Sequence, residues 1–132
     1  MDAQDTGVPR VRTYVREYVT RSDLTMENLF AQWKDKLAAG FVNSGALSGD
    51  KQVALQQLQT FAGQHGMLWA SFPLQPTGTG PDDLNRLGSN SGLMTQADND
   101  DPALTPPRGD RLTAELFGRH VAERALRWRR GA

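Results

Sequence analysis

Residues 37–42 read LAAGFV and residues 67–72 read MLWASF. Neither run alternates apolar with polar side chains, and each ends at a chain-breaking signal: Asn43-Ser44-Gly45 follows the first run and Pro73 follows the second. Short apolar runs without alternation are typical of strands that are buried on both faces. The sequence therefore predicts two buried strands, over residues 37–42 and 67–72.

The segment between these runs has the pattern of an amphipathic helix. Ser48 is placed to cap this helix, Asp50 falls in its first turn near the positive end of the helix dipole, and Gly66 follows its last turn. The residues of its apolar face are Ala54, Leu55, Leu58, Phe61 and Ala62. A strand, a helix and a strand within residues 37–72 form a βαβ unit, so we expect the two strands to be parallel.

The flanking segments contain further helices and one long loop. The spacing of Val11, Tyr14, Val15, Tyr18 and Val19 predicts an N-terminal helix over residues 11–19. Residues 73–109 are rich in Gly, Pro, Asn, Asp, Ser and Thr, which predicts a loop of unusual length. After it, Asp110 is placed to cap a final helix. The buried stripe predicted for that helix is Leu116, Phe117, Val121, Ala125 and Trp128.

Composition narrows the class of protein. The 132 residues include 15 basic and 15 acidic side chains, so the formal net charge is zero, and no field over the whole chain attracts nucleic acid or an anionic membrane. No apolar run approaches the roughly 20 residues of a membrane span. Because the chain has no cysteine, it has neither a disulfide framework nor a thiolate metal site, and we expect a cytoplasmic location. The basic segment from Arg124 to Arg130 leaves local binding of nucleic acid as a weaker alternative.

The loop after the first predicted strand is the best candidate for a binding site. In parallel sheets, ligands bind beyond the carboxyl ends of the strands, where backbone N–H groups meet anions or rings. The candidate residues here are Asn43, Ser44, Gly45, Ala46, Leu47 and Ser48. An ordinary turn between strand and helix is the alternative. His65 is expected at the opposite end of the unit, and no spacing of His, Asp or Glu side chains predicts a metal site.

Several blocks, in order, are similar to one protein family. They are WKDKLAAGFVNSG at residues 33–45, SGDK at 48–51, QHGM at 64–67, PDDLNRLGS at 81–89, GLM at 92–94 and TAELFGR at 113–119. Together they resemble the C-terminal portion of the flavodoxin-like NADPH-dependent FMN reductase and NAD(P)H:quinone oxidoreductase family. Residues 33–132 are the part that corresponds to this half domain, and residues 1–32 form a divergent helical segment.

The resemblance implies a fold and a function. The fold is an incomplete flavodoxin-like parallel sheet of the α/β class, which retains a βαβ unit and a C-terminal helix. The function is transfer of electrons from NAD(P)H through noncovalent FMN to a quinone-type small-molecule acceptor. In the family, the segment at Asn43–Ser48 wraps the flavin ring, and the position of His65 lies near flavin and acceptor within an assembled oligomer. Asn85, Arg86 and Ser89 belong to a loop near the ring and the subunit contact.

The resemblance does not include the family's first three strands, its phosphate-binding loop and first helix, or the loop after its third strand. The strand over residues 37–42 then lacks the neighbour that the family places on its inner edge, and an unpaired apolar edge favours association. We therefore expect a homo-oligomer. The alternative function is a non-catalytic, self-associating interaction module built on a partial flavodoxin-like fold.

Overall fold

The computed structural model describes residues 32–131. The helix predicted over residues 11–19, with nearly all of the segment 1–32, lies outside these residues. The elements in chain order are β1 (Leu37–Ala38), β2 (Phe41–Ser44), α3 (Lys51–Gln64), β3 (Leu68–Trp69), β4 (Leu93–Gln96) and α4 (Arg108–Gly131). The predicted helix between two strands, followed by a C-terminal helix, is confirmed.

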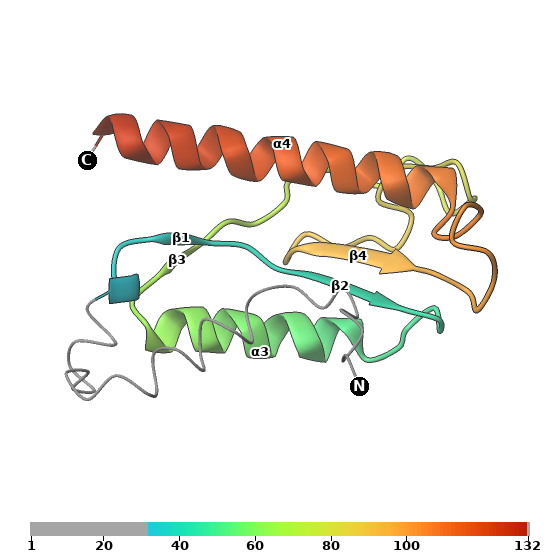
Figure 1. Cartoon of the computed structure of the whole chain (residues 1–132), viewed down its shortest axis with the longest axis horizontal. Coiled ribbons are helices and arrows are strands. Elements are labelled where there is room, and N and C mark those ends of the chain that lie inside the picture. The colour runs from blue at the N-terminus through green and yellow to red at the C-terminus, as the bar shows by residue number, and fades with distance from the viewer. Residues whose placement is uncertain (1–31, 132) are drawn as a thin grey trace, which may run out of the picture.

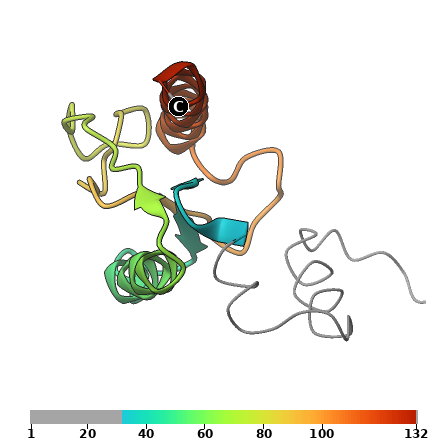
Figure 2. The ribbon, with the colours of Figure 1, turned by 90° about the vertical axis from the view of Figure 1, so that its left-hand side faces the viewer.

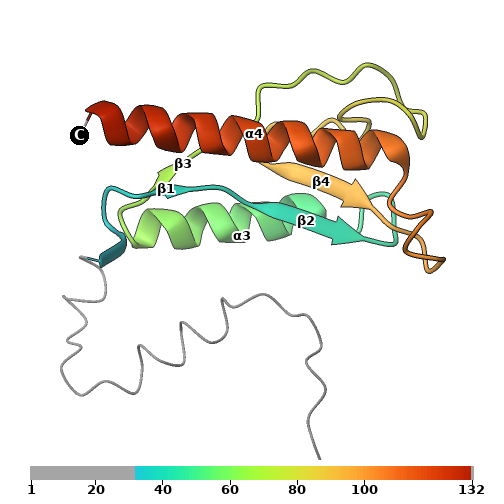
Figure 3. The same cartoon turned by 45° about the horizontal axis from the view of Figure 1, so that its top comes forward.

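The described part of the chain has three layers. The strands form the middle layer, α3 covers one face of it and α4 covers the other (Figures 1 and 2). The arrows of β2 and β4 point the same way, whereas both helices run back against them (Figure 3). The start of α4 and the loops after β2 and β4 therefore meet at the carboxyl end of the strands, and the end of α4 lies over β1 and β3 (Figure 1).

The pair β1–β3 is parallel, as predicted, but the prediction that both strands are buried on both faces is wrong, since Phe41 is 65% and Leu68 43% exposed. Leu37 is opposite Leu68 in the pair β1–β3, and Phe41 is opposite Leu93 in the pair β2–β4. The carbonyls that accept across these pairs belong to Lys36, Ala38, Gly40 and Ser44, which are all even-numbered. Because successive residues of a strand face opposite edges, β3 and β4 pair with the same edge of one continuous segment, residues 36–44.

The long loop predicted over residues 73–109 is wrong in part, because it contains the strand β4. The chain leaves the sheet after β3 and makes an excursion of about 20 residues. It then returns to continue pairing along the same edge at Leu93. This return needs a residue without a side chain, since a Cβ on Gly92 would lie 2.5 Å from the carbonyl oxygen of Gly40. Leu93 and Thr95 are buried, but four residues among turn-forming neighbours make too short a pattern to predict a strand.

Helix α3 begins later than predicted. It starts at Lys51, and its N-cap residue is Asp50, not Ser48. Asp50 makes no side-chain cap and has φ +52°, as does Gly49, so the chain makes an extra left-handed turn before the helix. The predicted apolar face is confirmed only at Leu55 and Ala62, which are buried, and at half-buried Ala54, because Leu58 and Phe61 are exposed. Gly66, at φ +65°, has the predicted left-handed conformation after the helix.

The hydrophobic core lies between the strands and the first half of α4. It is formed by Phe72, Leu93 and Phe117, with the Phe72 and Phe117 rings in edge contact at 5.2 Å between centroids. Farther along α4 the predicted stripe is only half-buried at Val121 and Ala125, and Trp128 is 44% exposed. The second half of α4 therefore stands off the sheet, which leaves the cavity described below.

Two features of the outer surface bear on partners. Within residues 32–131, no strand pairs with the odd-numbered edge of residues 37–43, and Phe41 on this segment is 65% exposed. None of the described helices is both long and apolar enough to cross a membrane.

Candidate functional site

The predicted binding loop lies at the carboxyl end of the β2–β4 pair. Asn43 and Ser44 are the last residues of β2, opposite Thr95 and Gln96 of β4. The Thr95 hydroxyl donates to Asn43 Oδ1 over 2.8 Å, which joins the two strand ends through their side chains. The loop itself, residues 45–50, is exposed to solvent, in agreement with a position where a ligand could reach the backbone.

Every carbonyl of residues 45–48 accepts a hydrogen bond from the protein. Gln96 Nε2 donates to the carbonyl of Gly45 over 3.0 Å. Lys51 Nζ donates to the carbonyls of Ala46 and Leu47, at 2.5 and 3.0 Å, and the backbone N–H of Lys51 donates to Ser48 at 3.1 Å. By contrast, no N–H group of residues 45–49 donates to any other residue in the described part of the chain.

This asymmetry orients the peptide groups of the loop. In a trans peptide, the C=O of one residue and the N–H of the next point in opposite directions. With the carbonyls of residues 45–48 turned toward the protein, the N–H groups of residues 46–49 point away from it. The loop therefore presents a row of backbone donors, which can bind the oxygen or nitrogen acceptors of an anion or a polar ring.

Lys51 is the residue that holds this loop in shape. Its side chain is 1% exposed, and its ammonium satisfies two backbone carbonyls five and four residues before it in the chain. Burial lowers the pKa of Lys51; the nearby Asp110 carboxylate raises it, and the Arg86 guanidinium lowers it further. The close turn also requires Gly49, because a Cβ there would overlap the Ser44 hydroxyl.

A buried ion pair is connected to the same loop through Gln96. Arg86 and Asp110 bond through both carboxylate oxygens, with Nε to Oδ1 at 2.7 Å, and their side chains are 10% and 2% exposed. Asp110 Oδ2 also accepts the backbone N–H of Gln96 over 2.8 Å. Since Gln96 holds Gly45, these four residues connect the start of α4 and the end of β4 to the loop. We call them the Arg86–Asp110 network.

Asp110 thus has a different role from the one predicted. Helix α4 begins at Arg108, so Asp110 lies inside the first turn and is not its N-cap. The helix start is pressed against the loop at Asp82–Asp83, where a Cβ on Gly109 would overlap the carbonyl oxygen of Asp83. This contact turns the Asp110 carboxylate toward Arg86 and the end of β4.

Asn85 and Ser89 also have a local structural role. Both are buried: Asn85 Nδ2 donates to the carbonyls of Leu74 and Ser89, and Ser89 Oγ donates to Gly92. The N–H of Asn85 donates to the Thr113 hydroxyl on α4 over 2.9 Å. These bonds close the excursion between β3 and β4, and they occupy both side chains within the protein.

His65 lies at the other end of the βαβ unit. It is the C-cap residue of α3, and its ring lies against that of Phe61, with the centroids 4.4 Å apart and the planes tilted by 58°. A helix of this length separates it from the loop at residues 45–50 by about 20 Å. The structure of a single chain therefore brings residues 43–48 together but does not bring His65 to them.

The concave surface beside the loop is small. A cavity of about 270 Å³ opens between Arg86, Gln96, Asp98 and the segment 104–107. Most sites for small molecules enclose about 300–1,000 Å³, so this cavity is smaller than a usual enclosed site, and no residue of the loop at 45–50 lines it. In residues 32–131, no group of three or more His, Asp or Glu side chains is arranged to hold a metal ion.

Among these supporting residues, Lys51 could be singled out from the sequence, but Arg86 and Asp110 could not. Lys51 and Asp50 are the only charged residues between 37 and 80, so an isolated lysine beside the candidate loop was visible in the sequence. Arg86 and Asp110 are 24 residues apart, and no spacing rule connects them. Their partnership depends on the excursion folding back against α4.

Comparison with known proteins gives one relative of direct interest. Flavodoxin FldP of Pseudomonas aeruginosa (strain UCBPP-PA14) is 41% identical to the chain over 105 residues, which is 76% of this chain and 57% of FldP. The chain thus spans somewhat more than half the length of this curated relative. No protein-family model matches the sequence, and no solved structure matches it. The parallel strands, their crossover helix and the covering C-terminal helix, together with the similarity to FldP, give the described chain a partial flavodoxin-like α/β fold.

Proposed function

We propose that the chain binds FMN noncovalently at the carboxyl ends of β2 and β4 and serves in electron transfer. The observation that carries this proposal is the row of outward N–H groups at residues 46–49, fixed by carbonyls that are all bonded inward. The polar edge of a flavin ring carries acceptors at N1, O2, O4 and N5, which backbone donors can bind, with a single donor at N3. The similarity to a protein named flavodoxin supports the same ligand.

Each residue of the site has a distinct part in this proposal. The backbone of residues 46–49 binds and orients the ring, while Lys51 and the Arg86–Asp110 network hold the loop rigid before the ligand arrives. Bound FMN would supply the redox chemistry, with NAD(P)H as the electron donor and a quinone-type small molecule as the acceptor. The protein then contributes binding and orientation of the ring.

Replacing Lys51 tests the role of the loop. In Lys51→Met the carbonyls of Ala46 and Leu47 lose their donor while the length of the side chain is kept. We expect FMN to bind roughly tenfold more weakly, which corresponds to about 1.4 kcal/mol, because binding must then order the loop. The measurement is titration of the full chain into FMN, with binding monitored by the quenching of flavin fluorescence. Lys34→Met, which removes an exposed charge, is the matched control and should bind as the wild type does.

Two results would contradict this proposal. If the wild type binds FMN and Lys51→Met binds it equally well, the flavin lies elsewhere. If the wild type takes up no FMN at high concentration and its visible spectrum shows no flavin, the chain alone is not a flavoprotein.

His65 is proposed to act on the acceptor within an oligomer. Within one chain His65 lies too far from the flavin site, but the His65 of a second copy could lie beside it. His65→Ala should lower the rate of NAD(P)H-dependent reduction of a quinone, with the FMN content of the protein little changed. Steady-state kinetics at equal flavin content measures this effect. An unaltered rate would remove His65 from the reaction.

A second function, a non-catalytic interaction module, is favoured by exposed Phe41 and by the edge of residues 37–43, which no strand within residues 32–131 pairs with. In this alternative the chain associates with itself through the strand edge and binds no flavin. Analytical ultracentrifugation tests self-association separately from flavin binding. A monomer at all concentrations argues against association through the edge, whatever the flavin content.

A further inference from the structure

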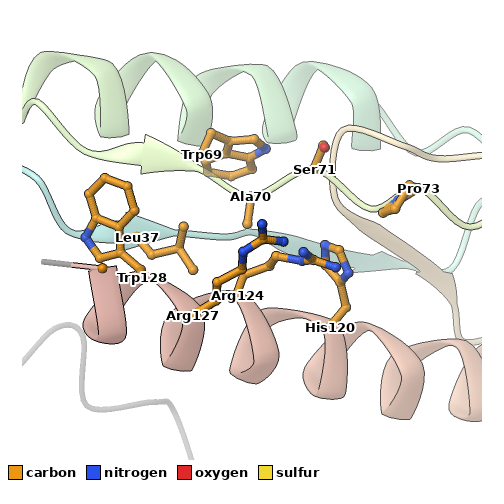
Figure 4. A pocket seen from close by; sticks show the side chains of 10 residues that line it. Leu37, Trp69, Ala70, Ser71, Pro73, His120, Arg124, Arg127 and Trp128 are labelled. Atoms are coloured by element: carbon orange, nitrogen blue, oxygen red, sulfur yellow. The ribbon is translucent and has the colours of Figure 1, made fainter.

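A larger cavity lies at the end of the molecule opposite the loop at residues 45–50. It has a volume of about 710 Å³, between β1 and β3 on one side and the second half of α4 on the other (Figure 4). This volume falls within the range of sites for small molecules. The side chains that give it chemical character are Trp69, Ser71, His120, Arg124, Arg127 and Trp128.

The two tryptophans are held in place by their own hydrogen bonds. Trp69 Nε1 donates to the carbonyl of Ser91 over 2.6 Å, and Trp128 Nε1 donates to the carbonyl of Asp35 over 2.9 Å. Each indole is therefore fixed at its polar edge, and its ring borders the cavity. Rings fixed in this way lose little entropy when a flat ligand stacks on them.

The two guanidinium groups of the cavity are not neutralised by the described residues. His120, Arg124 and Arg127 extend from α4 toward the strands, between Trp128 and the segment Ser71–Pro73 (Figure 4). Within residues 32–131, neither guanidinium forms an ion pair or a hydrogen bond with another residue, whereas Arg86 and Arg108 both have carboxylate partners. Two guanidinium groups that converge on one cavity without a carboxylate favour a phosphate ligand.

We propose that this cavity binds a nucleoside phosphate, with the base stacked on the tryptophans and the phosphate held by Arg124 and Arg127. Because the cavity has aromatic as well as cationic walls, an inorganic anion would contact only the arginines, whereas a nucleoside phosphate would contact both. A free mononucleotide and the nucleotide part of NAD(P)H carry the same chemistry, and the experiment distinguishes them. This site goes beyond the proposed flavin site, because it shares no residue with the loop at 43–50.

The experiment is calorimetric titration of the flavin-free full chain with AMP, NADPH and inorganic phosphate, each on its own. We expect AMP to bind at one site and phosphate to bind at least tenfold more weakly, because it lacks a base to stack. Affinity for NADPH at least tenfold above that for AMP would identify the dinucleotide as the ligand; equal affinity would identify a mononucleotide. No saturable binding of either nucleotide, or equal binding of phosphate and AMP, overturns the proposal.

A matched pair of double variants locates the site. R124Q/R127Q removes the two charges inside the cavity, and R129Q/R130Q removes two charges from the same helix end that do not line it. The first should weaken AMP binding at least tenfold, and the second less than twofold. Equal weakening by both variants would show diffuse attraction to a basic helix end and would overturn the site. Circular dichroism checks that both remain helical, which is expected because all four side chains are exposed.

Discussion

Asp110→Ala is expected to lower the free energy of unfolding by about 3–5 kcal/mol, which is a large part of the 5–15 kcal/mol that a domain of this kind has. The substitution leaves the Arg86 guanidinium buried without its carboxylate and takes the acceptor from the N–H of Gln96. An uncompensated buried charge costs far more than the pair contributes. Urea denaturation followed by circular dichroism measures the change.

A second variant tests whether the loss of stability comes from the unpaired charge. In R86M/D110L the guanidinium and the carboxylate are removed together, so the Arg86 charge is not left buried without its partner, and we expect the loss of stability to be smaller than in Asp110→Ala. If Asp110→Ala unfolds at the same urea concentration as the wild type, the network contributes nothing. If the double variant is the less stable of the two, it is the pair itself that holds the end of β4.

The same variants probe the flavin proposal independently of stability. In R86M/D110L, the N–H of Gln96 lacks its acceptor, and Gln96 positions the carbonyl of Gly45. Looser geometry at the loop should weaken FMN binding at a temperature where the variant is still folded. The network residues act by positioning the loop, since the structure places their side chains behind it.

Phe117→Ala is expected to cost about 3–5 kcal/mol of unfolding free energy, the typical loss for removal of a buried aromatic ring. Phe117 is 6% exposed and is the main anchor of α4, through its edge contact with Phe72 and its place beside Leu93. Thermal and urea unfolding both measure the effect. Leu126→Ala on the same helix is the control, because Leu126 is 52% exposed and should change stability by less than about 0.5 kcal/mol.

The two outcomes separate two ways of attaching α4. A large loss in Phe117→Ala with none in Leu126→Ala shows that the core contacts of the first half hold the helix on the sheet. The second half, which is joined to Asp35 through the Trp128 hydrogen bond, then contributes little apolar packing, as the cavity requires. Comparable losses in both would mean that the second half of α4 packs against a partner, and the cavity beside it would then be occupied.

The sequence predicted the central unit because local pattern and global fold agree there. Residues 37–42 and 67–72 were expected as parallel strands joined by a helix, and the pair β1–β3 confirms the parallel arrangement, whereas the partner of β2 is β4, which was not predicted. The boundaries were less predictable. The first strand is interrupted at Gly40, where a Cβ would lie 2.6 Å from the Trp69 ring. Of the second run, only Leu68–Trp69 pairs as a strand.

The candidate loop at residues 43–48 was also found from the sequence, since small polar residues after an apolar run are visible without a structure. Its orientation was not. Which way its peptide groups turn depends on Lys51, on Gln96 from β4, and on the left-handed turn at Gly49–Asp50. The capping role predicted for Ser48 was wrong for the same reason, because that turn delays the helix to Lys51.

By itself, the sequence determined the class of fold, the parallel unit and the position of the loop, because these depend on periodicity and on turn residues close together in the chain. Only the tertiary structure decided the pairing of β4, the Arg86–Asp110 network and the cavity between Trp69 and Arg124. Each of these joins residues more than 20 positions apart. Such contacts depend on how the excursion and the final helix pack against the strands, and no local pattern records that packing.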